Sequence, residues 1–203
     1  LSYDLKDQMA ALIGHFTPER MQNNRDGISE KFSELILTPF AANALELMFE
    51  ISDLVVSSSV PQTLIGCFIP ECNQMRFLLR NLTYHQHPVC THTLNALRRT
   101  QKELDRLRNS HPELYQFLKP FHLLALKWGI LFHDIGKIDP QSKHQVSGTS
   151  IAVNALERLG YQDPELMNLV SLLIVHHMSV VQLSKTSAYF DQALQNFFEI
   201  ADR

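Results

Sequence analysis

The segment 121–133 most constrains what this chain can fold into. Apolar side chains cover it nearly all round, and a helix of that kind is buried inside a core rather than lying on a surface. Its most apolar stretch, 123–132, contains Lys127 and is far shorter than the roughly 20 residues needed to cross a bilayer. We therefore expect 121–133 to be the central helix of a globular domain and not a membrane anchor.

The rest of the chain has the same helical period. Apolar positions recur at three and four residues, glycines number only seven, and no Asn-Gly or Asp-Gly hairpin signal separates alternating runs. We predict an all-α fold. Besides 121–133, the expected helices are 28–37, 40–56, 92–108, 146–159, 166–178 and 187–203, with short segments over 64–84 and further starts at Pro112 and Pro120.

A length of 203 residues predicts one domain with a small appendage. We expect 1–26 to be a polar tail or loose helix, 27–64 a helical appendage, and 65–203 the main domain. The chain begins at Leu1 without a secretory leader, so we expect it to be a segment of a longer protein.

Charge and cysteine content exclude several classes. With 18 basic and 21 acidic residues the net charge is −3, so we do not expect nucleic-acid binding. An odd set of three cysteines, Cys67, Cys72 and Cys90, argues against a disulfide framework and for a reducing compartment, hence a cytoplasmic protein. Cys67 and Cys72 have no second pair, so a thiolate zinc site is not expected.

The unusual feature of the composition is its ten histidines. Two adjacent polar residues, His133 and Asp134, lie where the most apolar helix ends. Burying an imidazole beside a carboxylate is costly unless both are hydrogen-bonded or hold a metal. A capping Asp beside a hydrogen-bonded His is the alternative interpretation of this pair.

Further residues in helical positions can converge on this pair. His92 lies at the start of a helix. The spacing of His177 from three apolar residues of its own helix places it on the same, core-facing side as those residues. His176 stays an alternative metal ligand. Asp202, on the last expected helix, is a candidate for the last carboxylate ligand of a metal site. Imidazole and carboxylate ligands without thiolate favour Mn, Fe, Zn or Co, with Mg as a further candidate.

His92, His133-Asp134 and Asp202, in this order, resemble the H…HD…D signature of the HD superfamily of metal-dependent phosphohydrolases, whose fold is all-α. The run 133–137, HDIGK, is similar to the HD-x-G-K form of that signature. The strongest resemblance is to the HD domains of PII uridylyltransferase/uridylyl-removing enzymes, and next to the tRNA nucleotidyltransferase and poly(A) polymerase group. It is carried by residues 69–71, 84–94, 131–144 and 176–180.

This resemblance implies hydrolysis of a phosphoester or phosphodiester with one or two divalent metal ions. It implies a first ion held by His92, His133, Asp134 and Asp202. It implies a second ion held by His144 and His177, with Asp134 bridging the two ions. Lys137 is expected to contact the substrate phosphate, which makes Asp134 and Lys137 the expected catalytic residues. The implied partner is a phosphorylated or nucleotidylated substrate, including a PII-like regulatory protein. A membrane is not an expected partner.

Other functions fit the same residues. A nucleotidase or cyclic-nucleotide phosphodiesterase would use the same ligands. A second possibility is an inactive HD-like helical domain that serves as a sensing or docking module. A third, the HD domain of a tRNA nucleotidyltransferase-like protein, predicts a basic face that the net charge of −3 does not favour.

Overall fold

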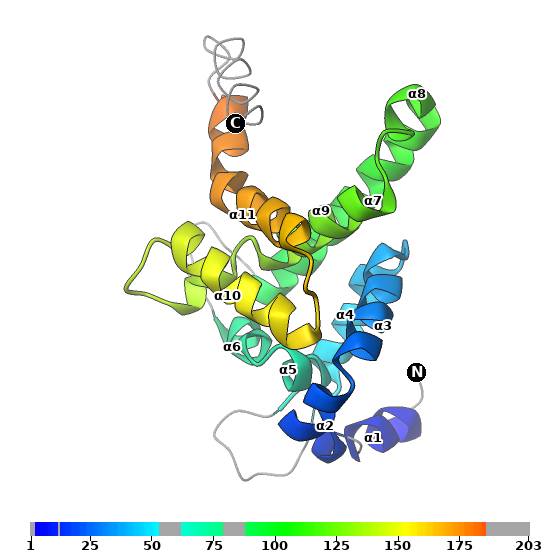
Figure 1. The fold of residues 1–203 in the computed structure, drawn as a ribbon, viewed down its shortest axis with the longest axis vertical. Helices are drawn as coiled ribbons and strands as arrows, with labels where there is room; N and C mark the ends of the chain where they lie inside the picture. The colour runs from blue at the N-terminus through cyan, green and yellow to red at the C-terminus, as the bar shows by residue number, and fades with distance from the viewer. Residues whose placement is uncertain (1–2, 12, 53–61, 79–87, 186–203) are drawn as a thin grey trace.

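The structure is a computed structural model that describes residues 3–11, 13–52, 62–78 and 88–185. Helices form nearly all of this part of the chain, so the predicted all-α fold is confirmed (Figure 1). The helices are α1 (Tyr3–Ala11), η1 (Ile13–His15), α2 (Pro18–Asn23), α3 (Arg25–Leu37), α4 (Ala41–Glu50), α5 (Leu64–Phe68), α6 (Glu71–Phe77), α7 (Val89–Ser110), α8 (Pro112–Tyr115), α9 (Pro120–Phe132), η2 (Ile135–Ile138), α10 (His144–Leu159) and α11 (Pro164–Lys185).

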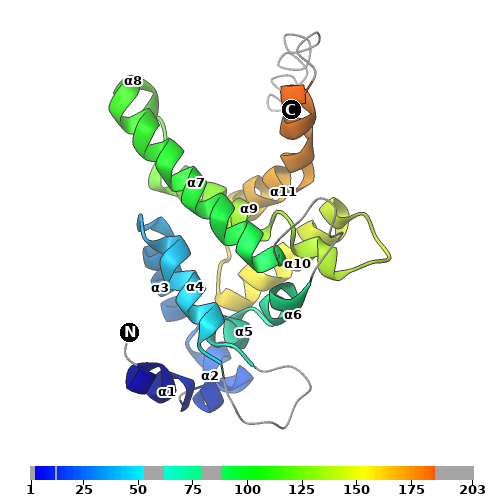
Figure 2. The ribbon, with the colours of Figure 1, turned by 180° about the vertical axis from the view of Figure 1, so that it is seen from behind.

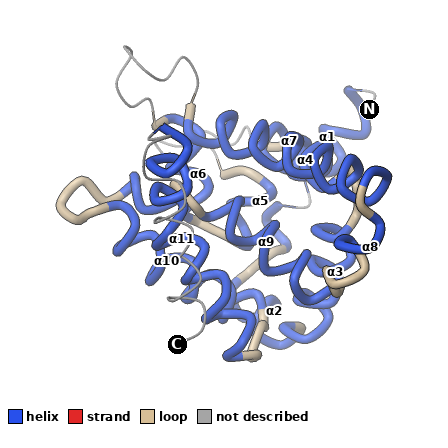
Figure 3. The backbone as a smooth tube through the Cα atoms, turned by 90° about the horizontal axis from the view of Figure 1, so that it is seen from above, coloured by secondary structure: helices blue, strands red, loops and turns tan. Residues whose placement is uncertain are grey.

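Helix α9 is the central helix, as its apolar sequence predicts. It packs against α3, α7, α10 and α11, and Figure 3 shows it running between the other helices. Trp128 and Phe132 are both fully buried, and their rings stack with centroids 5.2 Å apart. Tyr161, which follows α10, meets the Trp128 ring edge-on at 5.8 Å. This aromatic cluster fixes the end of α9 from which the candidate site projects.

Helices α7 and α11 leave the body in different directions. Figures 1 and 2 show α7 with α8, and α11, as two arms that diverge above α9. Gly129 of α9 lets α11 come close, since a Cβ at this position would lie 2.9 Å from Leu173 Cδ1. The floor between the two arms is therefore built on a close contact between α9 and α11.

Several boundaries differ from the sequence prediction. The helix predicted over 40–56 ends at Glu50 because Ser52 forms an antiparallel bridge with Thr63 and the backbone there is extended. Helix α11 continues beyond residue 178 to Lys185. The capping start before it is as predicted, since Asp163 Oδ1 accepts a hydrogen bond from Glu165 N at 2.9 Å. The helix predicted over 187–203 lies outside the described residues.

The first 26 residues are largely helical where the structure describes them, in α1, η1 and α2. Ile13 is 5% exposed and packs in a small cluster with Ile51 and Leu64. Residues from 27–64 also enter the main core, among them Phe32 and Leu45. The division of the chain into appendage and main domain stays a proposal.

Within the described residues, no single helix has both the length and the apolar character to cross a membrane. Helices α3 and α4 satisfy that test of length and composition only as a pair, across a bend of 119°.

Lys127 is a buried cation inside α9, with only 3% of its surface exposed. Its ammonium donates hydrogen bonds to Thr38 O at 2.9 Å and to Gln101 Oε1 at 2.8 Å, with Leu37 O at 3.5 Å. The two carbonyls belong to the last residue of α3 and to its C-cap, where helix carbonyls lack partners within the helix and a positive charge is favourable. Lys127 therefore ties α9 to the end of α3.

We predict that Lys127→Met lowers the free energy of unfolding by about 1–3 kcal/mol, since buried acceptors lose their donor. Burial lowers the pKa of Lys127, so the unfolded chain holds this proton more tightly and folding gains stability as the pH rises toward about 10.4. The deficit of Lys127→Met should widen over that range. Urea denaturation at several pH values measures it, with exposed Lys102→Met as the control, and equal stability of both variants would contradict the assignment.

Candidate metal centre

Four helical segments bring the candidate ligands together around one carboxylate. His133 and Asp134 follow the last residue of α9, before η2 begins. His92 lies in the first turn of α7, His144 is the first residue of α10, and His177 lies in the middle of α11. Asp134 is 3% exposed and is thus the buried centre of the group.

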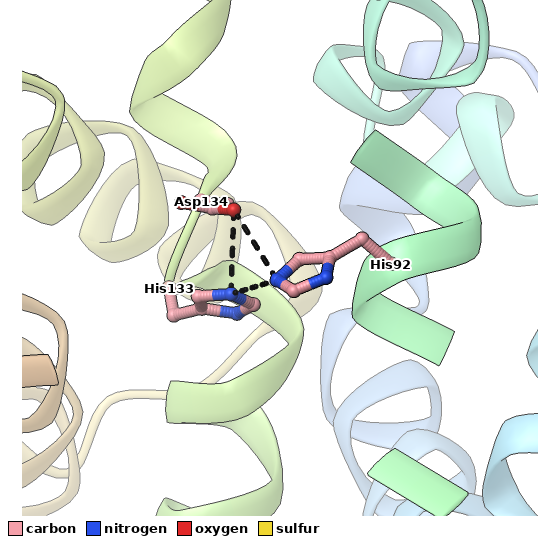
Figure 4. Close-up of side chains that lie close together, drawn as sticks. All are labelled: His92, His133 and Asp134. Atoms are coloured by element: carbon pink, nitrogen blue, oxygen red, sulfur yellow. Dashed lines mark hydrogen bonds and ion pairs between the residues drawn. The ribbon is translucent and has the colours of Figure 1, made fainter. Parts of the chain in front are cut away.

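One pair of imidazoles faces Oδ2 of Asp134. His133 Nε2 lies 3.4 Å and His92 Nε2 3.6 Å from this oxygen, and the two nitrogens are 3.2 Å apart. Figure 4 shows the three side chains pointing toward one another from α7 and from the end of α9. Metal–nitrogen bonds of about 2.1 Å place neighbouring ligand atoms about 3.0 to 3.4 Å apart. The three atoms are therefore spaced as one face of a metal coordination shell.

A second pair of imidazoles faces the other oxygen, Oδ1. His144 Nε2 lies 3.8 Å and His177 Nε2 3.9 Å from it, and the two nitrogens are 3.4 Å apart. The separations are slightly longer than in the first group, yet still suit one ion between the three atoms. Asp134 thus presents one carboxylate oxygen to each pair of histidines.

Backbone carbonyls fix the tautomer of two of these rings. His133 Nδ1 donates a hydrogen bond to Ile130 O, and His177 Nδ1 donates one to Ile174 O, both at 2.7 Å. Because a carbonyl only accepts, each Nδ1 carries a proton, and in the neutral ring this leaves the lone pair on Nε2, which is directed at the group. Burial lowers the pKa of His177, which favours its neutral ring. This is the arrangement by which outer hydrogen bonds orient metal-binding histidines.

The carboxylate at the centre is ionised. Burial by itself raises the pKa of Asp134, but the hydrogen bonds and charges of His133 and Lys137 outweigh it, and the pKa lies well below its usual range. Lys137 Nζ lies 2.5 Å from Asp134 Oδ2, and the lysine side chain is 13% exposed. The centre therefore combines one buried anion, imidazole donors and one cation.

The other candidates fall into three groups. His176 lines the adjoining cavity but is not in either three-atom group, so the geometry favours His177 over His176. Asp202 lies outside the described residues, as do His85 and His87. The cysteines Cys67, Cys72 and Cys90 are buried thiols that form no disulfide among the described residues, and neither group of candidate ligand atoms found there includes one.

Two glycines hold the halves of the site together, a role that the sequence did not reveal. A Cβ on Gly136 would lie 2.0 Å from His144 O and 2.5 Å from Gly148 N. Ser147 Oγ also donates a hydrogen bond to Gly136 O at 3.2 Å. The turn that carries Asp134 therefore sits directly on the first turn of α10, which carries His144.

A cavity of about 780 Å³ adjoins the ligands between α7, α9 and α11. Away from the ligands, the described lining is mostly apolar, a property that no motif of the sequence indicated. The arginines that follow His92 do not line it: Arg98 Nη2 pairs with Glu46 Oε2 at 2.5 Å, and Arg99 is exposed.

We predict that Gly136→Ala destabilises the protein by about 1–3 kcal/mol or more, because the added methyl has backbone atoms in its way. It should also weaken metal binding, since the η2 turn must move away from α10. Thermal unfolding and metal titration measure both effects. The control is Gly27→Ala, where a Cβ meets no atom within 4 Å. A Gly136→Ala protein with unchanged melting temperature would contradict the described packing.

Comparison with known proteins supports a distant relationship. The chain is 30% identical over 125 residues to a bifunctional uridylyltransferase/uridylyl-removing enzyme of Gluconobacter oxydans, covering 61% of this chain and 13% of that protein. It is 24% identical over 143 residues to the enzyme of the same name from Rhodopseudomonas palustris, covering 68% of this chain and 15% of that protein. No protein-family model matches the chain, and no solved structure matches it significantly. The chain is thus distantly similar to a small part of these enzymes.

Proposed function

We propose that this chain is a metal-dependent phosphohydrolase that cleaves a phosphoester or phosphodiester. The observation that carries the proposal is the placement of Asp134, whose two oxygens each face a pair of histidine Nε2 atoms. Paired ligand sets that share a carboxylate suit two neighbouring metal ions, an arrangement that supports displacement at phosphorus. The distant similarity to enzymes named as uridylyl-removing agrees with this chemistry.

The donor set fits divalent ions of the Mn, Fe, Zn or Co type. His92, His133 and Asp134 would hold one ion. Asp134, His144 and His177 would hold the other. Asp202 stays a proposed further ligand of the first. Bound ions of this kind lower the pKa of a coordinated water and polarise the phosphoryl oxygen.

Within the chain itself, two groups act on the substrate's charge. Lys137 supplies a cation beside the ligands, positioned to stabilise the negative charge that gathers on the phosphoryl oxygens in the transition state. Asp134 stays ionised and keeps the imidazoles oriented around it. In the overall reaction the water oxygen bonds to phosphorus, the ester P–O bond breaks, and the leaving oxygen takes up a proton.

The substrate that the resemblance implies is a nucleotidyl group on a protein, with a PII-like regulatory protein as the carrier. A free nucleotide is the second candidate, since the same ligands would serve both. An inactive sensing or docking module remains the alternative from another class, and the measurements below separate it from an enzyme.

We predict that the protein binds two equivalents of Mn²⁺ or Zn²⁺ and that the metal raises its melting temperature. Asp134→Asn should lose both equivalents, because its side chain belongs to both ligand groups. Elemental analysis after dialysis and thermal unfolding with and without chelator measure this. The control is Asp139→Asn, a partly exposed carboxylate five residues further along the chain that belongs to neither ligand group. Full metal content in Asp134→Asn would refute the site.

We also predict Mn²⁺-dependent hydrolysis of bis-p-nitrophenyl phosphate. Lys137→Met should lower kcat by about 10²- to 10³-fold, the loss typical when one stabilising group for transition-state charge is removed. Release of p-nitrophenolate measures it, with Lys143→Met as the matched control on the exposed loop. Metal-loaded protein that hydrolyses neither this diester nor a panel of nucleotides would favour the sensing module instead.

A further inference from the structure

The cavity beside the candidate metal centre has two chemically distinct parts. At one end lie the histidines, Asp134 and Lys137. Away from that end the lining comes from α7, α9 and α11, and most of it is apolar: Ala96, Leu126, Gly129, Ile130, Leu172, Leu173 and Met178. Thr100 and His176 add the polar groups there. A volume of about 780 Å³ lies within the range of small-molecule sites.

The charge in this cavity is limited. Among the described lining residues, Lys137 is the one lysine or arginine, and it already pairs with Asp134. A di- or triphosphate would extend its further anionic groups beyond the ions at the metal end into the apolar part, where they would lose their hydration without cationic partners. The apolar part would leave a second anionic group without a partner. The cavity therefore suits one phosphoryl group at the metal end and an apolar group beyond it.

We propose that the substrate class is a phosphoester or phosphodiester with a single phosphorus, whose ester substituent is an alkyl or aryl group buried between α7, α9 and α11. This inference rests on the proposed function, because it takes the metal end as the place where the phosphoryl group binds. It differs from the resemblance in the substituent, since the apolar lining favours an alkyl or aryl group over a nucleoside. The apolar lining supplies affinity for the substituent, and Thr100 and His176 provide only a few hydrogen bonds.

The test is a binding series with alkylphosphonates, which carry one phosphorus and no scissile ester. Calorimetric titration of the Mn²⁺-loaded protein compares methyl-, butyl- and hexylphosphonate. The Kd should fall about three- to fourfold with each buried methylene. 6-Phosphonohexanoate has the same chain with a terminal carboxylate, and we expect it to bind at least about tenfold more weakly than hexylphosphonate. A Kd that does not change with chain length, or equal binding of the two six-carbon ligands, overturns the proposal.

Two variants of α11 locate the binding site. Leu172 lines the cavity and is 40% exposed, whereas Val175 is 42% exposed, lies one turn further along, and is not among the lining residues. Leu172→Asp should abolish the dependence of Kd on chain length, and Val175→Asp should retain it. Ala96→Asp, on the α7 side, is the second variant if Leu172→Asp does not fold by circular dichroism. Retained chain-length dependence in a folded lining variant overturns the assignment of the cavity.

The proposed hydrolase activity and the proposed apolar substituent site can be refuted independently of each other. Failure to hydrolyse any diester, together with tight and chain-length-dependent phosphonate binding, refutes catalysis but supports the apolar site. Hydrolysis of a diester, together with phosphonate binding that does not change with chain length, supports catalysis and refutes the apolar site.

Discussion

The buried carboxylate of Asp134 is the constraint on which this structure depends. An ionised group that is 3% exposed is costly unless charges and hydrogen bonds surround it. Here Lys137 and His133 supply them, and the Nε2 atoms of His92, His144 and His177 lie within 3.9 Å of the carboxylate oxygens, brought there by α7, α10 and α11. Helices far apart in the sequence therefore meet at one side chain, and the core around Trp128 holds them there.

The same arrangement connects fold and chemistry. Carbonyls of α9 and α11 orient two of the imidazoles, so the helices that build the core also set the direction of the ligand atoms. The apolar floor of the cavity belongs to the core as well, because Gly129 brings α11 down onto α9. The polar and apolar ends of the cavity are thus both built on the packing of α11 against α9.

Sequence reasoning predicted the fold class, the central helix and the convergence of His92, His133 and His177, because helical period and burial are local signals. It missed contacts between distant segments. The end of the helix at Glu50 follows from the pairing of Ser52 with Thr63, and the burial of Lys127 follows from the carbonyls at the end of α3. Neither partner is visible in a local window of sequence.

The contact between Gly136 and the first turn of α10 has an evolutionary consequence. The exposed loop between η2 and α10 starts and ends at this contact, and Figure 1 shows it extending away from the body. Since the contact closes the loop at its base, its length and composition are free to vary without displacing Asp134 or His144. This loop is the place where related chains can acquire insertions next to the site while keeping its geometry.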